Sequence, residues 1–292
     1  MEYTNRTLLK EGRKRLDAAG IEAADIDAWL LFAGTTGLSR TEYLMRENDR
    51  ASDEVVSRFF DKIKRRAGRE PVQYIEGMAA FMGYEFSVNE NVLIPRMDTE
   101  VLVSEALRKA AELYAERLHG TQIKLLDMCT GSGCIAESMY LLLKKDGYLM
   151  QVTASDVSAA ALKVARLNAE RLGADIEFIQ GSLFEKIKGS YHMILSNPPY
   201  IRTDVIPDLE PEVREHEPAL ALDGRQDGLY FYREITAQAR EHLEDGGYLM
   251  FEIGYDQGME VCALCRDNGY TDIRVIKDLA GLDRVVTARL MC

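Results

Sequence analysis

The tetrapeptide Asn197-Pro198-Pro199-Tyr200 combines residue types that can hold an amino group in place. It follows residues 191–196, a short apolar run with the length and composition of a buried strand. Two consecutive prolines end that strand, because proline has no N–H to donate to a sheet ladder. The result is a stiff turn that presents carbonyl oxygens and one carboxamide at the carboxyl end of a strand, where open α/β sheets bind ligands.

The acceptors of this turn suit the transfer of a methyl group to a planar nitrogen. An amide or exocyclic amine has a delocalised lone pair, so a protein base cannot readily remove its proton beforehand. The side-chain carbonyl of Asn197 and the main-chain carbonyl of Pro198 can instead hold the NH₂ group and orient its nitrogen, and Tyr200 can pack against the planar group. These dipoles also favour positive charge developing on the nitrogen. Hydride transfer would need a proton relay, and neither His nor Lys stands beside the predicted strand ends.

A second group of residues has the pattern of a nucleoside cofactor site. Gly131-x-Gly133-x-x-Ala136 lies at a predicted strand-to-helix turn, where small residues let a ligand approach the backbone. Asp156 ends the next predicted strand, where a carboxylate can hold ribose hydroxyls, cap the following helix, or do both. Leu183 follows the third strand, where an adenine ring could pack. These features predict a nucleoside cofactor, and by themselves they leave NAD and S-adenosylmethionine both open.

Alternating strand and helix patterns position these residues. We expect strands at 123–128, 148–155, 176–180, 191–196, 247–253, 271–276 and 284–290, and helices at 134–144, 158–172, 229–243 and 257–268. Repeated βα units imply a mostly parallel, doubly wound sheet. The last two strands are joined by a short connection and imply an antiparallel edge. The predicted fold class is therefore α/β, with a Rossmann-like seven-stranded sheet.

The N-terminal part of the chain has a different pattern. Residues 1–75 carry apolar stripes with helical spacing and a capping-box pair, Ser39 with Glu42, which predict a small helical bundle. Residues 76–95 predict a β-hairpin linker, with strands at 81–88 and 92–94 around a turn at 89–91.

The second domain, residues 96–292, begins with a helix expected to run to about residue 118. Arg96 and Glu100 at its start could form a local ion pair. Much later, residues 207–227 form a long polar loop after the tetrapeptide. Long loops in compact domains are commonly functional, so we expect a lid on the substrate side.

The composition limits the class of partner. The 292 residues carry a net charge of −12, and the part after residue 90 holds 22 Lys/Arg against 32 Asp/Glu, a balance of −10. An acidic body disfavours stable nucleic-acid binding and suits a basic partner or a cationic ligand. The sequence shows no apolar run of membrane-spanning length and no signal peptide, and its five cysteines have no disulfide spacing. We therefore expect a cytoplasmic protein without a membrane or metal site.

From about residue 69 onward, the chain resembles the peptide chain release factor glutamine methyltransferases, the HemK/PrmC family. The matching segments are 69–77, 81–86, 92–100, 196–201 and 278–284. The resemblance implies a class I methyltransferase domain that uses S-adenosylmethionine. It also implies methylation of the glutamine in the Gly-Gly-Gln loop of class I release factors, with the N-terminal bundle contacting the release factor. We expect the protein to be a monomer.

The resemblance also assigns roles to individual residues. It implies that the cofactor site includes Cys129, Thr130, Gly131, Ser132, Gly133, Asp156, Leu183 and Asn197. It implies that the glutamine carboxamide is held by Asn197, Pro198, Pro199 and Tyr200, with Asn197 and Pro198 acting in catalysis. Two positions depart from the family pattern. Cys129 replaces a usual glycine and is strained if the position requires a positive φ, and Ser182 replaces a common acidic residue.

Two other functions share parts of this pattern. An amino methyltransferase acting on adenine or guanine of RNA or DNA can carry the same tetrapeptide, but it needs a basic channel and a pocket for a flipped base. A non-catalytic or NAD-binding module could keep the fold alone, and binding of NAD in place of S-adenosylmethionine would identify it.

Overall fold

The computed structural model describes residues 2–118 and 120–291. The chain forms two compact units, which are described in turn. The first contains Met1–Met78 together with Glu210–His216, and the second contains Ala79–Leu209 and Glu217–Cys292.

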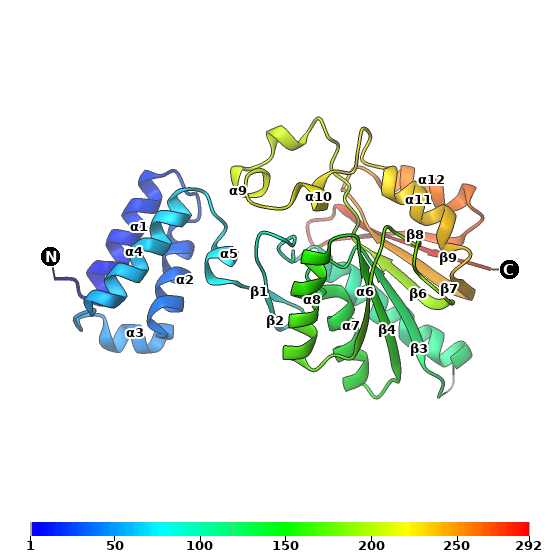
Figure 1. The fold of residues 1–292 in the computed structure, drawn as a ribbon, viewed down its shortest axis with the longest axis horizontal. Helices are drawn as coiled ribbons and strands as arrows, with labels where there is room; N and C mark the ends of the chain where they lie inside the picture. Colours follow the sequence, from blue (N-terminus) through cyan, green and yellow to red (C-terminus); the bar gives the residue numbers. More distant parts are fainter. Residues whose placement is uncertain (1, 119, 292) are drawn as a thin grey trace. The chain divides into compact units, whose positions relative to one another are not determined.

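The first unit is a helical bundle, as the apolar stripes predict. Its helices are α1 (Asn5–Ala18), α2 (Ala24–Thr36), α3 (Arg40–Arg46), α4 (Asp53–Ala67), α5 (Val72–Glu76) and the short α9 (Pro211–Arg214) (Figure 1). Leu8, Phe32 and Phe59 come from three different helices and are fully buried in its core. The predicted capping box is present, because the side chains of Ser39 and Glu42 each accept a hydrogen bond from the other's backbone N–H.

Segment 210–216 joins this bundle through a partly buried ion-pair network. Glu212 Oε1 accepts hydrogen bonds from Arg66 Nη2 at 2.9 Å and from Arg69 Nη1 at 3.1 Å. The same Arg66 donates from Nε to Asp27 Oδ2 at 2.6 Å, and its side chain is buried. The segment is part of the long polar loop expected to act wholly as a lid, so seven of its residues instead pack as part of the helical unit.

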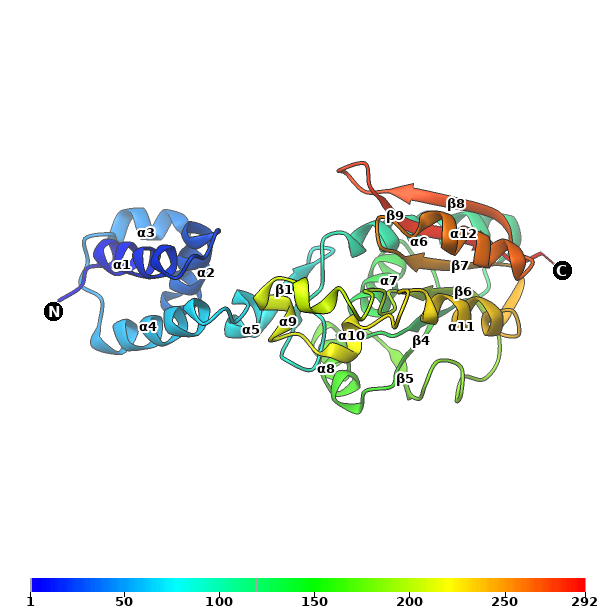
Figure 2. The ribbon, with the colours of Figure 1, turned by 90° about the horizontal axis from the view of Figure 1, so that it is seen from above.

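The second unit is built on a seven-stranded sheet. Its strands are β3 (Ile123–Met128), β4 (Met150–Asp156), β5 (Ile176–Gln180), β6 (Tyr191–Ser196), β7 (Leu243–Glu252), β8 (Thr271–Lys277) and β9 (Asp283–Arg289). Their order is β5-β4-β3-β6-β7-β9-β8. The first five are parallel, whereas β9 is antiparallel to both β7 and β8 at the edge seen in Figure 2. The predicted α/β fold with an antiparallel edge is confirmed.

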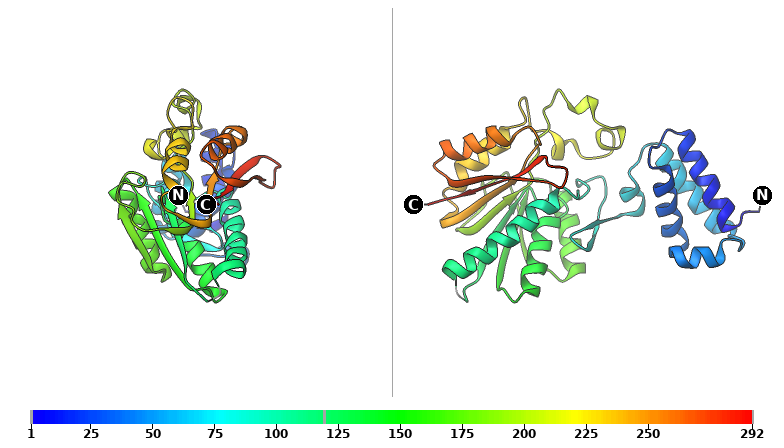
Figure 3. Two further views of the ribbon diagram at one scale, coloured as in Figure 1. Left: turned by 90° about the vertical axis from the view of Figure 1, so that its right-hand side faces the viewer. Right: turned by 180° about the vertical axis from the view of Figure 1, so that it is seen from behind.

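Helices cover both faces of this sheet (Figure 3). They are α6 (Thr99–Leu113), α7 (Cys134–Lys145), α8 (Ala159–Leu172), α11 (Tyr230–Ala239) and α12 (Gly258–Asp267), with a π-helical turn at Tyr114–Leu118, a 3₁₀ turn at Ile206–Asp208 and a short α10 (Ala219–Leu222). Buried side chains of α6 and α7 pack on one face, and those of α11 and α12 pack on the other. This arrangement brings the carboxyl ends of β3, β4, β5 and β6 to one edge of the sheet.

Three sequence-based boundaries are wrong. The helix expected at 229–243 is α11, which ends at Ala239. The hairpin consists of β1 (Met78–Phe81) and β2 (Tyr84–Ser87), and residues 92–94 form no strand. Its turn is at Met82 and Gly83, which both have positive φ (49° and 79°), as a two-residue hairpin turn requires. Strand β7 begins at Leu243 and not at Gly247, because it continues through Gly246, whose φ of 78° resembles a turn in the sequence. Among the described residues, no helix is both long and apolar enough to cross a membrane.

Candidate active site

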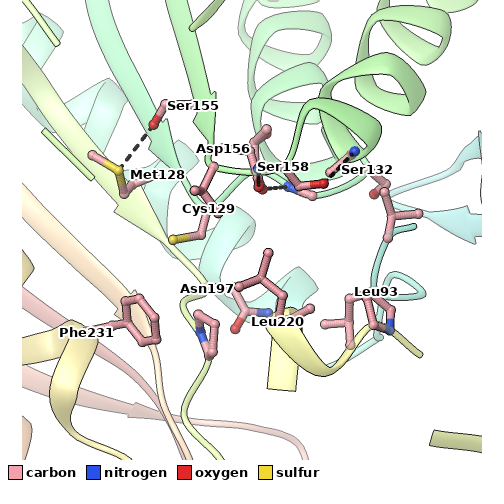
Figure 4. Close-up of a pocket in the computed structure, with 18 of the residues that line it drawn as sticks. Leu93, Met128, Cys129, Ser132, Ser155, Asp156, Ser158, Asn197, Leu220 and Phe231 are labelled. Atoms are coloured by element: carbon pink, nitrogen blue, oxygen red, sulfur yellow. Dashed lines mark hydrogen bonds between the residues drawn. The ribbon is translucent and has the colours of Figure 1, made fainter. Parts of the chain in front are cut away.

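A cavity of about 270 Å³ lies at the carboxyl ends of the parallel strands. Most of the predicted site residues line it, namely Cys129, Thr130, Gly131, Ser132, Asp156, Leu183, Asn197 and Pro199. The predicted residues Gly133, Pro198 and Tyr200 lie outside this lining. In Figure 4, Cys129 and Asp156 face Asn197 and Phe231 across the cavity. The structure therefore brings the candidate cofactor loop and the tetrapeptide to one place.

Asp156 connects the glycine-containing loop to the end of β4. Its Oδ2 accepts a hydrogen bond from the backbone N–H of Gly131 at 2.9 Å, and its Oδ1 accepts one from Ser158 N–H at 2.9 Å. The cap of α8 is Ser158 and not Asp156, because the Ser158 hydroxyl accepts from Ala161 N–H at 3.1 Å. Burial raises the pKa of Asp156, while the backbone donors oppose that shift. The aspartate thus holds the loop and keeps lone pairs for a ligand.

Asp127 supports the same loop from beneath, and the sequence prediction missed it. This residue near the end of β3 is fully buried. Its Oδ2 accepts hydrogen bonds from Thr130 Oγ1 at 2.5 Å and from Ala136 N–H at 3.2 Å, which fixes the turn to the start of α7. Burial raises the pKa of Asp127 to about 7. A lone carboxylate inside an apolar strand is the sequence signal that could have identified it.

Three residues with side chains adopt left-handed backbone conformations in the lining of this cavity. Cys129 has a φ of 62°, Leu183 has a φ of 46° and Arg225 has a φ of 72°. Such a conformation costs an L-residue with a Cβ atom roughly 1–2 kcal/mol. Backbone strain of this kind concentrates at functional sites. Cys129 has a positive φ at a position where the family usually has glycine, so the backbone is strained there.

We expect the strain at Cys129 to appear in the stability of two variants. Cys129→Gly should unfold with a free energy about 1 kcal/mol higher than Cys129→Ala, because both lose the sulfur but only alanine keeps a Cβ at positive φ. Urea unfolding followed by circular dichroism measures this difference. Cys134, the first residue of α7, provides the matched control. There the order should reverse, with alanine about 1 kcal/mol above glycine, and the same order at both positions would contradict the strain.

The carboxamide of Asn197 has a defined partner on α6. Its Nδ2 donates to Thr99 Oγ1 at 3.3 Å, so the carbonyl oxygen is turned away from Thr99. Thr99 is buried and also lines the cavity. The preceding residue, Ser196, donates from Oγ to the Met128 carbonyl at 2.7 Å and joins the ends of β6 and β3. These bonds fix the start of the tetrapeptide.

Tyr200, the last residue of the tetrapeptide, is held by its hydroxyl and its backbone. The hydroxyl donates to Glu252 Oε1 at 3.4 Å, and the carbonyl accepts from Gln257 Nε2 at 3.0 Å. Gly224 and Gly228 pass so close that an added Cβ would lie 2.7 Å from Tyr200 Cα and 2.4 Å from its carbonyl oxygen, respectively. Thr99, Glu252 and Gln257 were all missed from the sequence, although Glu252 directly follows the apolar run at 248–251.

The part of the long polar loop that returns to the second unit borders the cavity. Pro218, Leu220 and Ala221 line it. Arg96 forms an ion pair with Glu217 just before them, and not with Glu100 as the sequence spacing suggested. Glu100 instead accepts a hydrogen bond from the backbone N–H of Met82 at 2.7 Å. Within residues 2–118 and 120–291, no group of three His, Cys, Asp or Glu side chains is placed to hold a metal ion.

Comparisons with known proteins show what this chain is similar to. Residues 7–77 match a family model described as PrmC N-terminal domain, and residues 96–208 match the methyltransferase small domain. A release factor glutamine methyltransferase from Agrobacterium fabrum is 42% identical over 95% of this chain and 94% of its own length. One from Geobacter sulfurreducens is 40% identical over 99% and 97%, respectively. The solved hMettl16 catalytic domain, in complex with the MAT2A 3′UTR hairpin 6, shares the fold at 15% identity and a TM-score of 0.54, covering 78% of this chain and 81% of its own.

Proposed function

This chain belongs to the release factor glutamine methyltransferase family, and from this premise we propose that it methylates the side-chain amide nitrogen of the glutamine in the Gly-Gly-Gln motif of class I release factors. The methyl donor is S-adenosylmethionine. The observation that carries the proposal is the position of Asn197. Its carboxamide lies in one cavity with the loop that Asp156 holds.

The residues of the cavity fit this donor. A Cβ added at Gly131 would face open space in the described part of the chain, so a ligand can approach the backbone there. Asp156 keeps acceptor capacity for ribose hydroxyls, and Leu183 offers an apolar surface to the adenine. When bound, S-adenosylmethionine supplies a methyl group on a positively charged sulfur, which an amide nitrogen can attack without prior loss of its proton.

The chain's own residues contribute orientation and electrostatics. The carbonyl oxygens of Asn197 and Pro198 accept the two N–H groups of the substrate carboxamide and direct its nitrogen toward the donor. The same dipoles stabilise positive charge on that nitrogen while the new N–CH₃ bond forms and the S–CH₃ bond breaks. Pro199 keeps the turn stiff, and Tyr200 packs against the planar amide. After the transfer the positively charged nitrogen gives its extra proton to water, so a strong general base is not required.

The proposal includes the setting in which the enzyme acts. The partner is a class I release factor, the enzyme is a monomer in the cytoplasm, and it forms no stable complex with nucleic acid. The part after residue 90 has an excess of ten acidic groups, which supports a protein substrate over RNA or DNA. The proposal keeps the borders expected from the sequence, with the bundle in 1–75, the linker in 76–95 and the catalytic domain in 96–292, except that segment 210–216 belongs to the helical unit.

Methyl transfer from labelled S-adenosylmethionine tests this function. Purified enzyme is incubated with an unmethylated class I release factor, with total RNA, or with DNA. We expect label in the release factor only. Label in nucleic acid alone would identify the rival amino methyltransferase, and binding of NAD without binding of S-adenosylmethionine would identify the rival module.

We propose that the helical unit contacts the release factor through exposed apolar residues of α3. Leu44 and Met45 are 69% and 72% exposed, and exposed apolar groups of this kind mark interaction surfaces. The double variant Leu44→Ser/Met45→Ser should raise the KM for the intact release factor roughly fivefold, because two buried contacts of about 0.5 kcal/mol each are lost. The KM for a short Gly-Gly-Gln peptide should not change.

Leu167→Ser is the control for this variant, since Leu167 is 53% exposed on α8 of the other unit. It should leave both KM values within twofold of the wild type. An equal rise for protein and peptide in the double variant would show that the bundle supports folding and not substrate docking.

A further inference from the structure

We infer that Asn168 of α8 is a positioning residue for the methyl donor, because its carboxamide joins two separate segments of the cavity wall. One segment is the cofactor loop, residues 129–133, and the other runs from Ser87 at the end of β2 to Arg96. Asn168 itself lies outside the lining of the cavity, so it acts on S-adenosylmethionine only through these two segments. The inference depends on the methyl donor and not on the methyl acceptor.

The carboxamide of Asn168 is fully buried and makes four hydrogen bonds. Its Nδ2 donates to the Ser132 carbonyl at 3.0 Å and to the Ser87 carbonyl at 3.0 Å. Its Oδ1 accepts from the backbone N–H of Ser87 at 2.7 Å and from Arg171 Nη2 at 3.4 Å. These bonds use both donors and both acceptor positions of the side chain. A buried polar group that is satisfied in this way makes its surroundings rigid.

The partners of this carboxamide also fix its orientation. If the side chain turned over, its NH₂ group would face the N–H of Ser87, and its oxygen would face the carbonyls of Ser87 and Ser132. Donor would then meet donor, and acceptor would meet acceptor. Only the observed orientation pairs every group, so Asn168 links Ser87 to Ser132 in one defined geometry.

Ser132 is the point at which Asn168 reaches the cofactor loop. Ser132 is 3% exposed and belongs to the lining of the cavity. Within the same loop, the hydroxyl of Thr130 and the N–H of Gly131 are held by the two aspartates of β3 and β4. Asn168 therefore supplies a third anchor for the loop, and this anchor comes from a helix instead of a strand end.

Ser87 is the point at which Asn168 reaches the second segment. Val88 and Ile94 of that segment are buried, at 4% and 2% exposure. Five of its residues line the cavity, namely Asn91, Val92, Leu93, Pro95 and Arg96. A displacement of Ser87 relative to Ser132 would therefore change the shape of the cavity.

Loss of this link should weaken the binding of the methyl donor more than the transfer of its methyl group. Segments that are not held beforehand must be ordered when S-adenosylmethionine binds, and this cost reduces the affinity. The tetrapeptide depends on other groups, since Ser196 donates to the Met128 carbonyl and Gln257 donates to the Tyr200 carbonyl. We therefore expect a higher KM for S-adenosylmethionine and little change in kcat at saturation.

Two variants at position 168 test the inference. Asn168→Asp keeps the shape, but its carboxylate cannot donate to the two carbonyls, and Asn168→Ala loses all four bonds. The Kd for S-adenosylmethionine, measured by calorimetric titration, should rise about tenfold in each, while kcat at saturating S-adenosylmethionine stays within about threefold of the wild type. Asn268→Ala loses a carboxamide outside the cavity lining and should leave this Kd within about twofold. An unchanged Kd in either folded variant, or a lower kcat with an unchanged KM, would overturn the inference.

Hydrogen exchange in the wild type decides the matter if neither variant folds. Ser87 lies outside the cavity lining, so S-adenosylmethionine cannot cover its amide directly. The bound donor should nevertheless slow exchange of the Ser87 N–H, measured by NMR, because it stabilises the two segments that Asn168 joins. An unchanged exchange rate, or a wild type that does not bind S-adenosylmethionine, would overturn the inference. If these results hold but the release factor receives no methyl group, only the proposed function fails.

Discussion

Asn197→Ala should lower kcat for the release factor roughly 10²–10³-fold, the loss typical when one preorganised dipole is removed from a reacting centre. The alanine variant cannot accept the N–H of the substrate amide, and the Pro198 carbonyl alone leaves that group free to rotate. The Kd for S-adenosylmethionine should change less than threefold, because the loop at Gly131 and the carboxylate of Asp156 keep their hydrogen bond to each other. Steady-state kinetics and calorimetric titration of the cofactor measure the two quantities.

Asn268→Ala is the matched control for this variant. Asn268 follows α12 and donates from Nδ2 to the Leu264 carbonyl at 2.9 Å, so it loses a carboxamide of the same size away from the cavity. Its kcat should stay within about twofold of the wild type. Wild-type turnover in Asn197→Ala would show that Asn197 is not the acceptor.

Arg66→Ala should destabilise the helical unit by about 3 kcal/mol. Arg66 is 7% exposed and pairs with both Asp27 and Glu212, and removal of one partner from a buried ion pair typically costs about 3–5 kcal/mol. The lower end applies here because the Glu212 side chain is 20% exposed. The chain has a single tryptophan, Trp29 on α2, so its fluorescence during urea unfolding reports on this unit.

Arg69→Ala is the control for Arg66→Ala. Arg69 also donates to Glu212, but its side chain is 33% exposed, so water screens the pair and its loss should cost less than about 1 kcal/mol. Similar small losses in both variants would show that the network does not anchor segment 210–216 to the bundle.

The seven strands of the sheet could be predicted because each contains apolar or β-branched residues in a short segment between polar turns. The boundaries that were wrong have local causes. Gly83 provides the hairpin turn, but the polar run at 89–91 looked like the stronger turn signal. Gly246 has the sequence appearance of a turn although β7 passes through it. In both cases the tertiary surroundings, and not the local sequence, decide whether a glycine at positive φ lies in a turn or inside a strand.

The residues of the candidate site also fall into two groups, those that the sequence could predict and those that it could not. Cys129 to Gly133, Asp156 and Asn197 to Tyr200 stand at strand ends, where a motif and its element are contiguous. Thr99 lies 98 residues from Asn197, and Glu252 lies 52 residues from Tyr200, so neither pair leaves a local pattern. The pair of Arg66 and Glu212 spans 146 residues and could not be inferred from spacing either.

Mass spectrometry of the methylated release factor tests the central claim most directly. The release factor is incubated with the enzyme and S-adenosylmethionine, digested, and its peptides are fragmented to locate the added methyl group. The account predicts a single methyl group on the glutamine side chain of the Gly-Gly-Gln motif, present with the wild-type enzyme and nearly absent with Asn197→Ala. A methyl group on any other residue, or none while nucleic acid becomes methylated in a parallel reaction, would contradict it.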